Sequence, residues 1–424
     1  MANHNHIRSA GKGRYLRPII ATAALLLGCS LTPHAIAIGD AVMEWNQLAL
    51  AATVTAGQGP VPQARSMTIV QVAVHDAVNG ITNKHETYLP HGPAPAGASP
   101  DAAAIAAAHR ALSTLFPSQA STLNPARAAS LAARNLTDAN PGVAWGEQIA
   151  NAILAARLND GASQAQFTYA AAGAGSPGVW VPVGTAAALL PGWGNLSPWV
   201  LHNNSQFRPE GPPPLQSARY ARDYREVQEM GSLTSTKRTP QQTEIARFWL
   251  GTPSAIWNHV ARQVLDARAL DLSETARTLA LMYLAASDAS IVCWDVKYTH
   301  NFWRPITAIR NGDADGNAAT VADPTWQPLF ATPQHPEYIS GHSTNSGAMG
   351  AMLEFLFGDD PGVTIVALSP TNPGFARQWE KFSEGVDEVI DARIYSGFHY
   401  RTSDEVGARV GRQVARFVFT HALR

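Results

Sequence analysis

The sequence is poor in cysteine and contains no run of basic residues. Of its 424 residues only Cys29 and Cys293 are cysteines, and the formal net charge is -1. Once the N-terminal leader described next is processed, no internal disulfide and no cysteine-based metal site are expected. The scattered lysines and arginines indicate neither nucleic acid nor an anionic membrane surface as a partner. Any anion that this chain binds must therefore be held by a local cluster of cations.

The first 37 residues have the pattern of an export signal. Four cations precede an apolar run from Pro18 to Leu31, which is followed by A-I-A at 35–37. We expect residues 1–37 to be a signal peptide and the protein to be exported, either periplasmic or secreted. The stretch L-L-G-C resembles a lipoprotein box, so lipid anchoring at Cys29, and with it the type of signal peptidase, stays open. After the leader we expect no transmembrane segment in the mature chain.

A helical period dominates the rest of the chain. Apolar residues recur at spacings of three and four, and no region alternates with a period of two. With 46% hydrophobic residues the chain can bury a large core. We therefore predict an all-α fold, a large helical bundle built from two helical halves. The clearest helical stretches are 45–54, 69–81, 102–115, 148–158, 243–250, 273–286, 348–357 and 406–419.

A segment of different composition separates the two halves. From Gly173 to Pro214 the chain is rich in Pro, Gly, Trp and Asn, as in P-G-V-W-V-P-V-G. Irregular segments of this length are usually functional or connect domains. We predict an N-terminal helical half at 38–214, which includes this connection, and a C-terminal half at 215–424. The two halves are expected to pack as one body.

The C-terminal half contains K-Y-T-H-N-F-W-R-P, which places Lys297 and Arg304 seven residues apart. On one helix this spacing puts both side chains on the same face, and Pro305 would end the helix. Two cations held together repel each other unless an anion lies between them, and a planar guanidinium group suits tetrahedral oxyanions. A solvated basic face is the alternative. The neighbouring aromatic residues favour a pocket wall instead: Trp294, Phe302 and Trp303.

A second stretch, H-P-E-Y-I-S-G-H-S-T-N-S-G-A, places Ser340, Gly341 and His342 at the start of a predicted helix that runs to Phe357. The N–H groups at a helix start carry partial positive charge, and a glycine lets an anion approach the backbone closely. Ser340 adds a hydroxyl group. The alternative is that Ser340 only caps the helix and that His342 packs in its first turn.

A third stretch, A-R-I-Y-S-G-F-H-Y-R-T-S-D-E, supplies a further cation, Arg393, and an imidazole, His399, in a glycine-containing connection. We expect a helix to follow, with Thr402 and Glu405 as its capping box. A neutral imidazole in this position can be a nucleophile or a metal ligand, although a lone histidine in a loop is usually neither.

Taken together, the three stretches resemble the signature of one superfamily: Lys, six residues, Arg-Pro; then Ser-Gly-His; then Arg, five residues, His. This superfamily joins the vanadium-dependent haloperoxidases, the class A bacterial acid phosphatases and the type 2 phosphatidic acid phosphatases. The resemblance extends from Lys297 to about Asp404. The helical N-terminal half and phrases such as D-A-V-N-G-I are similar to bacterial proteins of the haloperoxidase branch.

Resemblance to the haloperoxidase branch implies an enzyme with vanadate as its cofactor. It would use hydrogen peroxide to oxidise halide to hypohalous acid, which reaches a small organic acceptor. By the same resemblance, vanadate is bound by Lys297, Arg304, Ser340, Gly341, His342, Arg393 and His399. His399 would be the metal ligand and His342 the acid/base group, and Lys297 completes the catalytic set.

The resemblance also implies a halide pocket at Trp294 and His335. The position of His335 is Phe in the fungal chloroperoxidases and His in the algal bromoperoxidases, so we expect bromide and iodide to be preferred over chloride. A titratable imidazole near the reacting oxygen can take up a proton, whereas Phe keeps the pocket apolar. Alternatively, His335 only stacks near the entrance of the site.

Three positions depart from the family pattern. Ile339 stands where proline is common, and Ala392 replaces the usual serine before the third cation. More important for the chemistry, the position four residues after His399 is often aspartate in the family but is Ser403 here, with Asp404 one residue later. A carboxylate there would orient the imidazole. Whether Asp404 supports His399 or only favours the helix start is open at this stage.

Two other functions fit the same residues. An exported soluble acid phosphatase would use His399 as the nucleophile in a phospho-histidine intermediate and His342 to protonate the leaving oxygen. A non-catalytic oxyanion-binding protein would need neither histidine. The phosphatidic acid phosphatase branch is disfavoured by the expected lack of a further membrane-spanning stretch. The sequence does not indicate the oligomeric state.

Two further motifs are weaker. The loop N-G-D-A-D-G at 311–316 copies the first half of a calcium-binding loop, but Ala322 occupies the position that needs glutamate, so a turn-rich loop is the preferred interpretation. His75 and Asp76 lie on a predicted apolar helix and are interpreted as a core pair.

Overall fold

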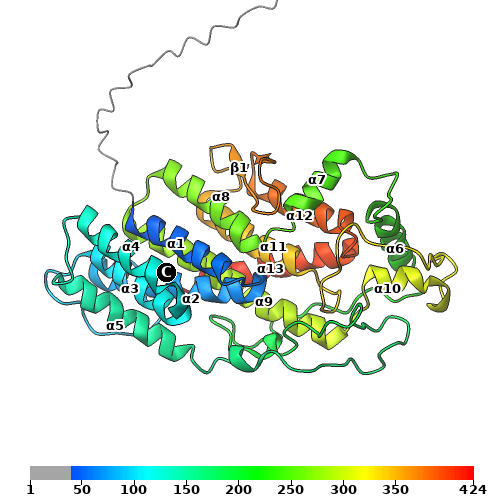
Figure 1. The fold of residues 1–424 in the computed structure, drawn as a ribbon, viewed down its shortest axis with the longest axis horizontal. Coiled ribbons are helices and arrows are strands. Elements are labelled where there is room, and N and C mark those ends of the chain that lie inside the picture. The colour runs from blue at the N-terminus through cyan, green and yellow to red at the C-terminus, as the bar shows by residue number, and fades with distance from the viewer. Residues whose placement is uncertain (1–39) are drawn as a thin grey trace, which may run out of the picture. The chain divides into compact units, whose positions relative to one another are not determined.

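Helices make up most of residues 40–424, the part of the chain that the computed structural model describes (Figure 1). Thirteen α-helices there are accompanied by one antiparallel ribbon of β1 (Ile365–Ala367) and β2 (Arg377–Trp379). The prediction of an all-α fold is therefore confirmed. The predicted signal peptide at 1–37, with Cys29, lies outside the described residues and stays a prediction.

The helices of the N-terminal half are α1 (Ala41–Thr55), α2 (Pro60–Thr82), α3 (Pro100–Leu115), α4 (Ala120–Ala133) and α5 (Pro141–Ala156). Those of the C-terminal half are α6 (Ala218–Met230), α7 (Pro240–Phe248), α8 (Pro253–Arg268), α9 (Leu272–His300), α10 (Pro305–Arg310), α11 (Gly341–Phe357), α12 (Phe382–Tyr395) and α13 (Arg401–His421). The eight stretches of apolar spacing correspond to α1, α2, α3, α5, α7, α9, α11 and α13. The other five helices have no counterpart in the prediction.

Small residues let the N-terminal helices approach one another closely. Helix α3 is rich in alanine and packs between α2 and α5. A Cβ atom added at Gly146 of α5 would lie 2.3 Å from the carbonyl oxygen of Ala103 in α3. A larger residue at Gly146 would therefore push the two helices apart. This layer supports α2, which packs in turn on α9.

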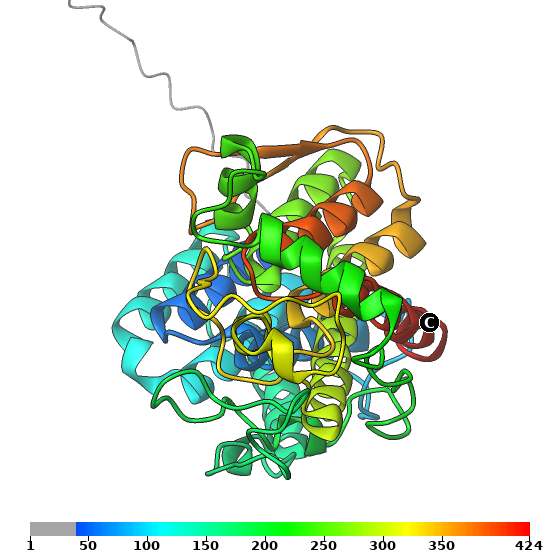
Figure 2. The ribbon, with the colours of Figure 1, turned by 90° about the vertical axis from the view of Figure 1, so that its right-hand side faces the viewer.

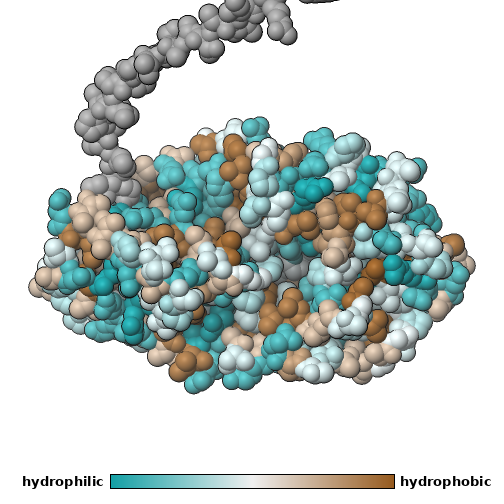
Figure 3. All heavy atoms as spheres, viewed as in Figure 1, coloured by the Kyte–Doolittle hydropathy of each residue, from teal (hydrophilic) through white to brown (hydrophobic). Residues whose placement is uncertain are grey.

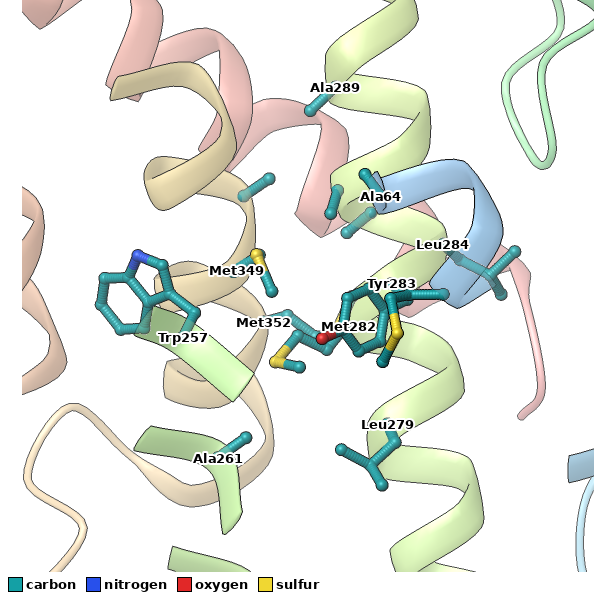
Figure 4. Packing of buried hydrophobic residues seen from close by; sticks show 14 of the residues in the cluster. Ala64, Trp257, Ala261, Leu279, Met282, Tyr283, Leu284, Ala289, Met349 and Met352 are labelled. Atoms are coloured by element: carbon teal, nitrogen blue, oxygen red, sulfur yellow. The ribbon is translucent and has the colours of Figure 1, made fainter. Parts of the chain in front are cut away.

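Helix α9 is the central element of the fold. Asp271 caps its start, and the helix packs against α2, α11 and α13. Figure 4 shows Tyr283 of α9 beside Met352 of α11, with Trp257 of α8 in the same core region. The apolar faces of helices from both halves of the chain thus meet around α9.

The length and composition of α9 correct one expectation. Its 29 residues include an apolar window, of mean hydropathy 1.4, that is long enough to cross a membrane. The expectation that no such stretch follows the leader is therefore wrong. In this fold 94% of the window is buried inside the protein, as it is in the core helix of a globular body. Length and composition alone do not distinguish a membrane-spanning helix from a buried core helix.

Helices α11 and α13 cross at very close range, and their N-terminal ends meet. A Cβ atom added at Gly411 of α13 would lie 2.0 Å from the carbonyl oxygen of Thr344 in α11. The two helix starts are also joined directly, since the N–H of Ser340 donates to the carbonyl oxygen of Ser403. The second and third motif stretches therefore lie side by side.

Hydrogen bonds donated by backbone N–H groups hold the connection between the two halves against α9. The buried carboxylate of Asp288 accepts the N–H groups of three consecutive residues, Trp199 to Leu201. Just beyond the C-terminal end of α9, the N–H of Trp180 donates to the carbonyl oxygen of Asn301. Figure 2 shows this connection as green loops alongside the yellow-green α9. It covers the end of α9 that carries Lys297.

On the face drawn in Figure 3, hydrophobic side chains form small separate groups among polar ones. The exposed large apolar residues of the described chain are likewise dispersed along the sequence, as at Leu158, Leu233 and Val321. That face has no extended apolar patch of the size that marks a docking surface.

Candidate functional site

Lys297 and Arg304 lie on different elements rather than on one helix face. Helix α9 ends just before Asn301, which adopts a left-handed backbone conformation (φ 48°), and Pro305 is the first residue of α10. A proline is favourable there because its missing N–H would have no partner within the helix. The predicted shared helix face is therefore wrong, since Pro305 begins a helix instead of ending one. The turn nevertheless brings both cations to the loop at 335–340.

Arg304 connects three parts of the site. Its Nε atom donates to the carbonyl oxygen of His335 (2.9 Å), and its Nη1 atom donates to the carbonyl oxygen of Phe398 (2.9 Å). Nη1 also lies 3.2 Å from Nε2 of His399, and Nη2 lies 2.9 Å from Nδ1 of His335. Because a guanidinium group only donates, Nε2 of His399 is an acceptor here. His335 accepts either through Nδ1 or, since Nδ1 also lies 3.1 Å from the carbonyl oxygen of Pro336, through Nε2 at 3.4 Å. Burial lowers the pKa of Arg304 to about 10.

Lys297 holds the loop that precedes α11. Its ammonium group donates to the carbonyl oxygens of Pro336 (3.0 Å), Glu337 (2.9 Å) and Ile339. The group is fully buried, and burial lowers its pKa to about 8. The lysine therefore fixes the backbone that leads into Ser340.

Arg393 of α12 is the third buried cation. Its Nη1 atom donates to the carbonyl oxygen of Trp249 (2.8 Å), and its guanidinium carbon lies 4.7 Å from the ring centroid of Phe398. Its Nε atom is buried and has no hydrogen-bond partner among the described residues. Burial lowers the pKa of Arg393 to about 9, against the raising effect of Asp404. A buried cationic donor without an acceptor is a feature that a bound anion would satisfy.

The start of α11 offers further donors. Ser340 is the N-cap, and its hydroxyl oxygen accepts the N–H of Ser343 (3.4 Å). The N–H groups of Gly341 and His342 are the first two of the helix and have no acceptor within it. Ser340 thus caps the helix, as the alternative interpretation held, while the free N–H groups and the helix dipole favour a bound anion.

His399 is held in one tautomer by its partners. Its Nδ1 atom lies 2.8 Å from Oε1 of Glu337, and the same oxygen accepts the N–H of Tyr400 (3.1 Å). The carboxylate accepts and Arg304 donates, so the proton is on Nδ1 and the lone pair is on Nε2. Burial and the nearby Arg304 lower the pKa of His399 well below its usual value, which keeps the ring neutral. Such a ring can bind a metal or attack an electrophile through Nε2.

Glu337 is the site residue that the sequence interpretation misses. It lies in the H-P-E-Y stretch, but its partner His399 is 62 residues further along the chain, and no spacing rule links the two. Burial raises the pKa of Glu337 to about 7, against the lowering effect of Arg304. Only the folded loop shows that this carboxyl group orients the imidazole.

Asp404 does not support His399. Its Oδ1 atom accepts the hydroxyl group of Ser343 (2.7 Å), and its side chain is fully buried in the first turn of α13. Burial raises the pKa of Asp404 well above its usual value. Asp404 therefore joins α13 to the start of α11, and the carboxyl group that contacts the imidazole belongs to Glu337.

The expected capping box of α13 is also wrong. The helix begins at Arg401, two residues earlier than a cap at Thr402 requires, and the side chain of its N-cap Tyr400 makes no capping hydrogen bond. The hydroxyl oxygen of Thr402 instead accepts a hydrogen bond from Nε of Arg219 (2.8 Å).

The two weaker motifs have structural contacts. In the loop at 311–316 the carboxylate of Asp315 accepts the hydroxyl group of Thr320 (2.8 Å). His75 and Asp76 form a buried pair, with Nδ1 and Oδ1 3.1 Å apart. The first contact is that of a turn-rich loop, and the second is that of a core pair, as the sequence suggested for each motif.

The two residues of the predicted halide pocket line a cavity of about 440 Å³. Trp294 and His335 line it together, with their ring centroids 5.0 Å apart. Burial, together with Lys297 and Arg304, lowers the pKa of His335 well below its usual value. His335 lies within hydrogen-bonding distance of Arg304, and its part in halide choice stays a prediction.

His342 presents one free nitrogen in the same cavity. Its Nε2 atom lies 3.2 Å from the carbonyl oxygen of Gly251, so Nε2 carries the proton and Nδ1 carries the lone pair. Burial and the nearby Arg393 lower the pKa of His342 well below its usual value. A neutral imidazole of this kind can take up a proton from a reactant.

The site holds more buried positive charge than its carboxyl groups balance. Lys297, Arg304 and Arg393 donate to carbonyl oxygens and to imidazoles, and none forms an ion pair with a carboxylate of the described chain. The nearby buried carboxyl groups are two, Glu337 and Asp404, against three cations, and burial raises the pKa of both. A bound anion would stabilise the charged forms of all three cations.

Comparison with known proteins identifies relatives of this site. Residues 277–424 match the family described as the VCPO second helical-bundle domain, and this range contains all three motif stretches. The chain is 27% identical to the vanadium chloroperoxidase of Curvularia inaequalis over 74% of its own length. It spans 64% of the length of that relative.

Solved structures share the fold over most of the described chain. The first bacterial vanadium-dependent iodoperoxidase has a TM-score of 0.77 and 25% identity, covering 90% of this chain and 96% of that one. An apo-type bacterial vanadium-dependent chloroperoxidase has a TM-score of 0.68 and 16% identity, covering 86% and 94%, and shows the shared fold alone. The resemblance to the vanadium haloperoxidases that the three motifs indicated is confirmed.

Proposed function

We propose that this chain is a vanadate-dependent haloperoxidase that uses hydrogen peroxide to oxidise halide to hypohalous acid. The observation that carries the proposal is the group of three buried cations, Lys297, Arg304 and Arg393, which have no carboxylate partner among residues 40–424. A tetrahedral oxyanion would balance this charge at the start of α11. Similarity to a vanadium chloroperoxidase and to a vanadium-dependent iodoperoxidase supports the choice.

The residues present fit vanadate. Arg393 offers a buried Nε–H without a partner in the described chain, and Nε2 of His399 offers a lone pair in a fixed tautomer. When bound, vanadate supplies a Lewis acid that activates hydrogen peroxide towards halide without a change in the oxidation state of the metal. The residues that would hold it are Lys297, Arg304, Ser340, Gly341, Arg393 and His399.

Each side chain has a separate task in this proposal. Glu337 keeps the proton of His399 on Nδ1, so that the lone pair is on Nε2, towards which Nη1 of Arg304 also points. Lys297 and the two arginines act on the oxyanion from buried positions, where electrostatic attraction is stronger than in water. His342 takes up a proton at Nδ1 from the incoming hydrogen peroxide, while the carbonyl group of Gly251 holds its ring in place.

We propose further that bromide and iodide are preferred over chloride. Support comes from His335, a polar ring at the position where an apolar Phe is the alternative, packed against Trp294. His335 occupies one donor of Arg304 that would otherwise be free for the oxyanion. The relatives include both a chloroperoxidase and an iodoperoxidase, so similarity does not decide between the halides.

The state of His399 also favours a second candidate, an acid phosphatase. A neutral imidazole with its lone pair on Nε2 is a competent nucleophile towards phosphorus, and Glu337 would stabilise the charge that develops on the ring. His342 would protonate the leaving oxygen in that reaction. Phosphate and vanadate are both tetrahedral oxyanions, so the same donors serve either one.

Two assays on the purified protein separate these candidates. Triiodide formation from iodide and hydrogen peroxide is measured with and without vanadate, and hydrolysis of p-nitrophenyl phosphate is measured without vanadate. We expect vanadate-dependent triiodide formation and at most slow hydrolysis. Hydrolysis without any vanadate-dependent iodide oxidation would establish the phosphatase instead. Tight vanadate binding with neither activity would leave a non-catalytic oxyanion-binding protein.

A further inference from the structure

A second cleft lies apart from the candidate site. It measures about 750 Å³ and is lined by the connection at 206–214, by α6 and α13, and by Tyr338. In the part of the chain that the structure describes, it shares no lining residue with the cavity that contains His342 and His399. Its volume is within the range of about 300–1,000 Å³ that is usual for small-molecule sites. The proposed function makes no use of this cleft.

Part of the cleft wall is apolar and stiff. It is formed by Phe207 and by the prolines of P-E-G-P-P-P at 209–214. Proline fixes the backbone φ angle and has no N–H group, so this wall offers apolar ring faces and few backbone donors. The hydroxyl group of Tyr338 donates to the carbonyl oxygen of Glu210 (2.7 Å) and holds the segment in place. An aromatic group can pack against such a wall without displacing a hydrogen bond.

Two arginines from different helices also line the cleft. Nε of Arg219 in α6 donates to the hydroxyl oxygen of Thr402 (2.8 Å), which fixes its guanidinium group. Its Nη2 atom lies 3.7 Å from Glu405 in an exposed ion pair, and exposed pairs contribute little, so the Nη groups can still serve a ligand. The guanidinium group of Arg409 in α13 forms no hydrogen bond or ion pair within the described chain.

The charges of these two arginines act on the same point of the cleft. Burial, and to a smaller degree the charge of Glu337, raises the pKa of Tyr338 to about 12, while Arg409 and Arg219 both oppose this rise. Both cations must therefore lie near the phenol group, because electrostatic interactions weaken with distance. Two cations held near one point favour an anion between them.

The other ionic groups of the wall limit the charge of that anion. Arg208 is already bound by the carboxylate of Asp295, at 2.7 and 2.6 Å. The carboxylate of Glu210 has no hydrogen-bond or ion-pair partner among the described residues, and it adds a negative charge to the cleft. Arg219 and Arg409 together thus exceed Glu210 by a single positive charge. A monoanion suits this balance better than a phosphate group, which is close to doubly charged.

We propose that this cleft is a second ligand site, which binds an organic monocarboxylate with an aromatic body. Arg219 and Arg409 bind the carboxylate, and the aromatic body packs on Phe207 and the proline wall. The planar guanidinium group suits a carboxylate because it can donate two parallel hydrogen bonds to it. The inference goes beyond the proposed function, since the ligand needs neither vanadate nor hydrogen peroxide in order to bind.

Binding is tested by calorimetry with 2-naphthoate and with its neutral analogue 2-naphthamide, on the full-length protein with and without saturating vanadate. Wild type is expected to bind 2-naphthoate about tenfold more tightly than the amide, the difference that one charge-assisted hydrogen bond makes. Vanadate should leave this difference unchanged, because the candidate site and the cleft are separate. The titration without vanadate also holds if the protein binds no vanadate, so a failure of the proposed function is distinguishable from a failure of this inference.

Variants at exposed positions locate the binding. Arg409→Gln should remove most of the difference between the two probes. Arg416→Gln is the matched control, since Arg416 is an exposed residue about two turns further along α13 and lies outside the cleft, and this variant should retain the difference. Glu210→Gln should have the opposite effect to Arg409→Gln and tighten the binding of 2-naphthoate alone, because a repelling carboxylate is removed.

A blocking variant tests the apolar part of the site. Gln413 is exposed on α13 and lines the cleft, so Gln413→Trp should obstruct it and weaken the binding of both probes. Equal affinity of wild type for the two probes would overturn the proposal, as would an equal loss of 2-naphthoate affinity in Arg409→Gln and Arg416→Gln. Binding of 2-naphthoate that saturating vanadate abolishes would place the probe at the candidate site and would overturn it as well.

Discussion

Two groups of buried charge in this protein differ in whether their cations have a carboxylate partner. At the end of α5, the carboxylate of Asp160 accepts hydrogen bonds from Nε of Arg65 (2.7 Å) and from Nε of Arg157 (3.1 Å). At the candidate site, Lys297 donates to backbone carbonyl groups, and Arg393 leaves its buried Nε without a partner in the described chain. The first group is complete within the fold, and the second requires an anion from outside.

The difference shows how a structural charge and a binding charge can be told apart. A buried pair satisfies its own electrostatics, so the loss of one member leaves the other uncompensated and destabilises the fold. A buried cation with a lowered pKa and no carboxylate partner costs free energy in the anion-free protein. It is retained where a ligand recovers that free energy. Mutations in the paired group should therefore lower the stability of the fold, whereas mutations in the unpaired group should lower the affinity for the anion.

The largest expected effect separates turnover from binding within the unpaired group. His342→Ala should lower the rate of halide oxidation about a hundredfold or more, because an acid/base group typically contributes that much. It should retain vanadate, since His342 contributes no charge to the site. His399→Ala should instead lose vanadate itself, together with the direct bond to the metal. Calorimetric titration of vanadate beside the triiodide assay checks both variants, and the reverse pattern would exchange the two roles.

The second effect concerns the carboxyl group that completes the site from within. Glu337→Gln should weaken vanadate binding by about 10- to 100-fold, because partners that orient a metal-binding histidine typically contribute this much. Asp404→Asn is the matched control, since Asp404 is equally buried but contacts Ser343 instead of His399. Calorimetry of both variants gives the measurement. A greater loss of affinity in Asp404→Asn than in Glu337→Gln would show that Asp404, next to the family position at Ser403, supports the histidine instead of Glu337.

The positions of the cations were predictable from the sequence, whereas their geometry was not. The order and spacing of three short stretches give Lys297, Arg304 and Arg393, because those residues act locally within each stretch. The shared helix face was wrong because Asn301 and Pro305 make one helix end and another begin, which a count of seven residues does not show. Glu337 could not be assigned to His399 because the contact depends on the fold of two separate loops.

For the fold as well, the sequence predicts some helices clearly and others not. Helices with a broad buried face, such as α9, have a clear apolar period. Helix α6 buries Tyr220, Tyr224 and Val227 at helical spacing, but charged residues surround them, so its apolar content is low. Helix α12 likewise places acidic residues between its buried positions. Helices that cover the site from one side therefore give a weaker sequence signal than helices at the centre of the core.

The third prediction compares the two groups directly. Arg393→Ala should weaken vanadate binding by roughly tenfold, the loss expected when one charge-assisted hydrogen bond is removed, with little loss of stability in the anion-free protein. Asp160→Ala should do the opposite, lowering the free energy of unfolding by about 3 kcal/mol because Arg65 and Arg157 lose their shared partner, with unchanged vanadate affinity. Denaturant unfolding and calorimetry on both variants give the comparison. Equal loss of affinity in both would remove the distinction.

The smallest expected effect concerns halide choice. His335→Phe should raise the ratio of chloride to bromide oxidation by about fivefold, a change of the size that one hydrogen bond produces. The physical reason is that Nη2 of Arg304 now donates to His335 (2.9 Å), and removal of that acceptor frees the donor for the oxyanion. A donor turned towards the oxyanion withdraws electron density from the oxygen that the halide attacks, which favours the less easily oxidised chloride. Initial rates with each halide at one pH measure the ratio.

His335→Asn is the control for this change, because an amide oxygen can still accept from Arg304 and should keep the ratio close to that of wild type. The comparison also tests the alternative in which His335 only stacks on Trp294, since Phe would preserve stacking and Asn would not. If Asn shifts the ratio and Phe does not, packing against Trp294 controls the halide preference. If wild type oxidises chloride as fast as bromide and neither variant changes that, His335 has no part in halide choice. The three cations would then still bind the oxyanion, since none of them depends on His335 for its charge.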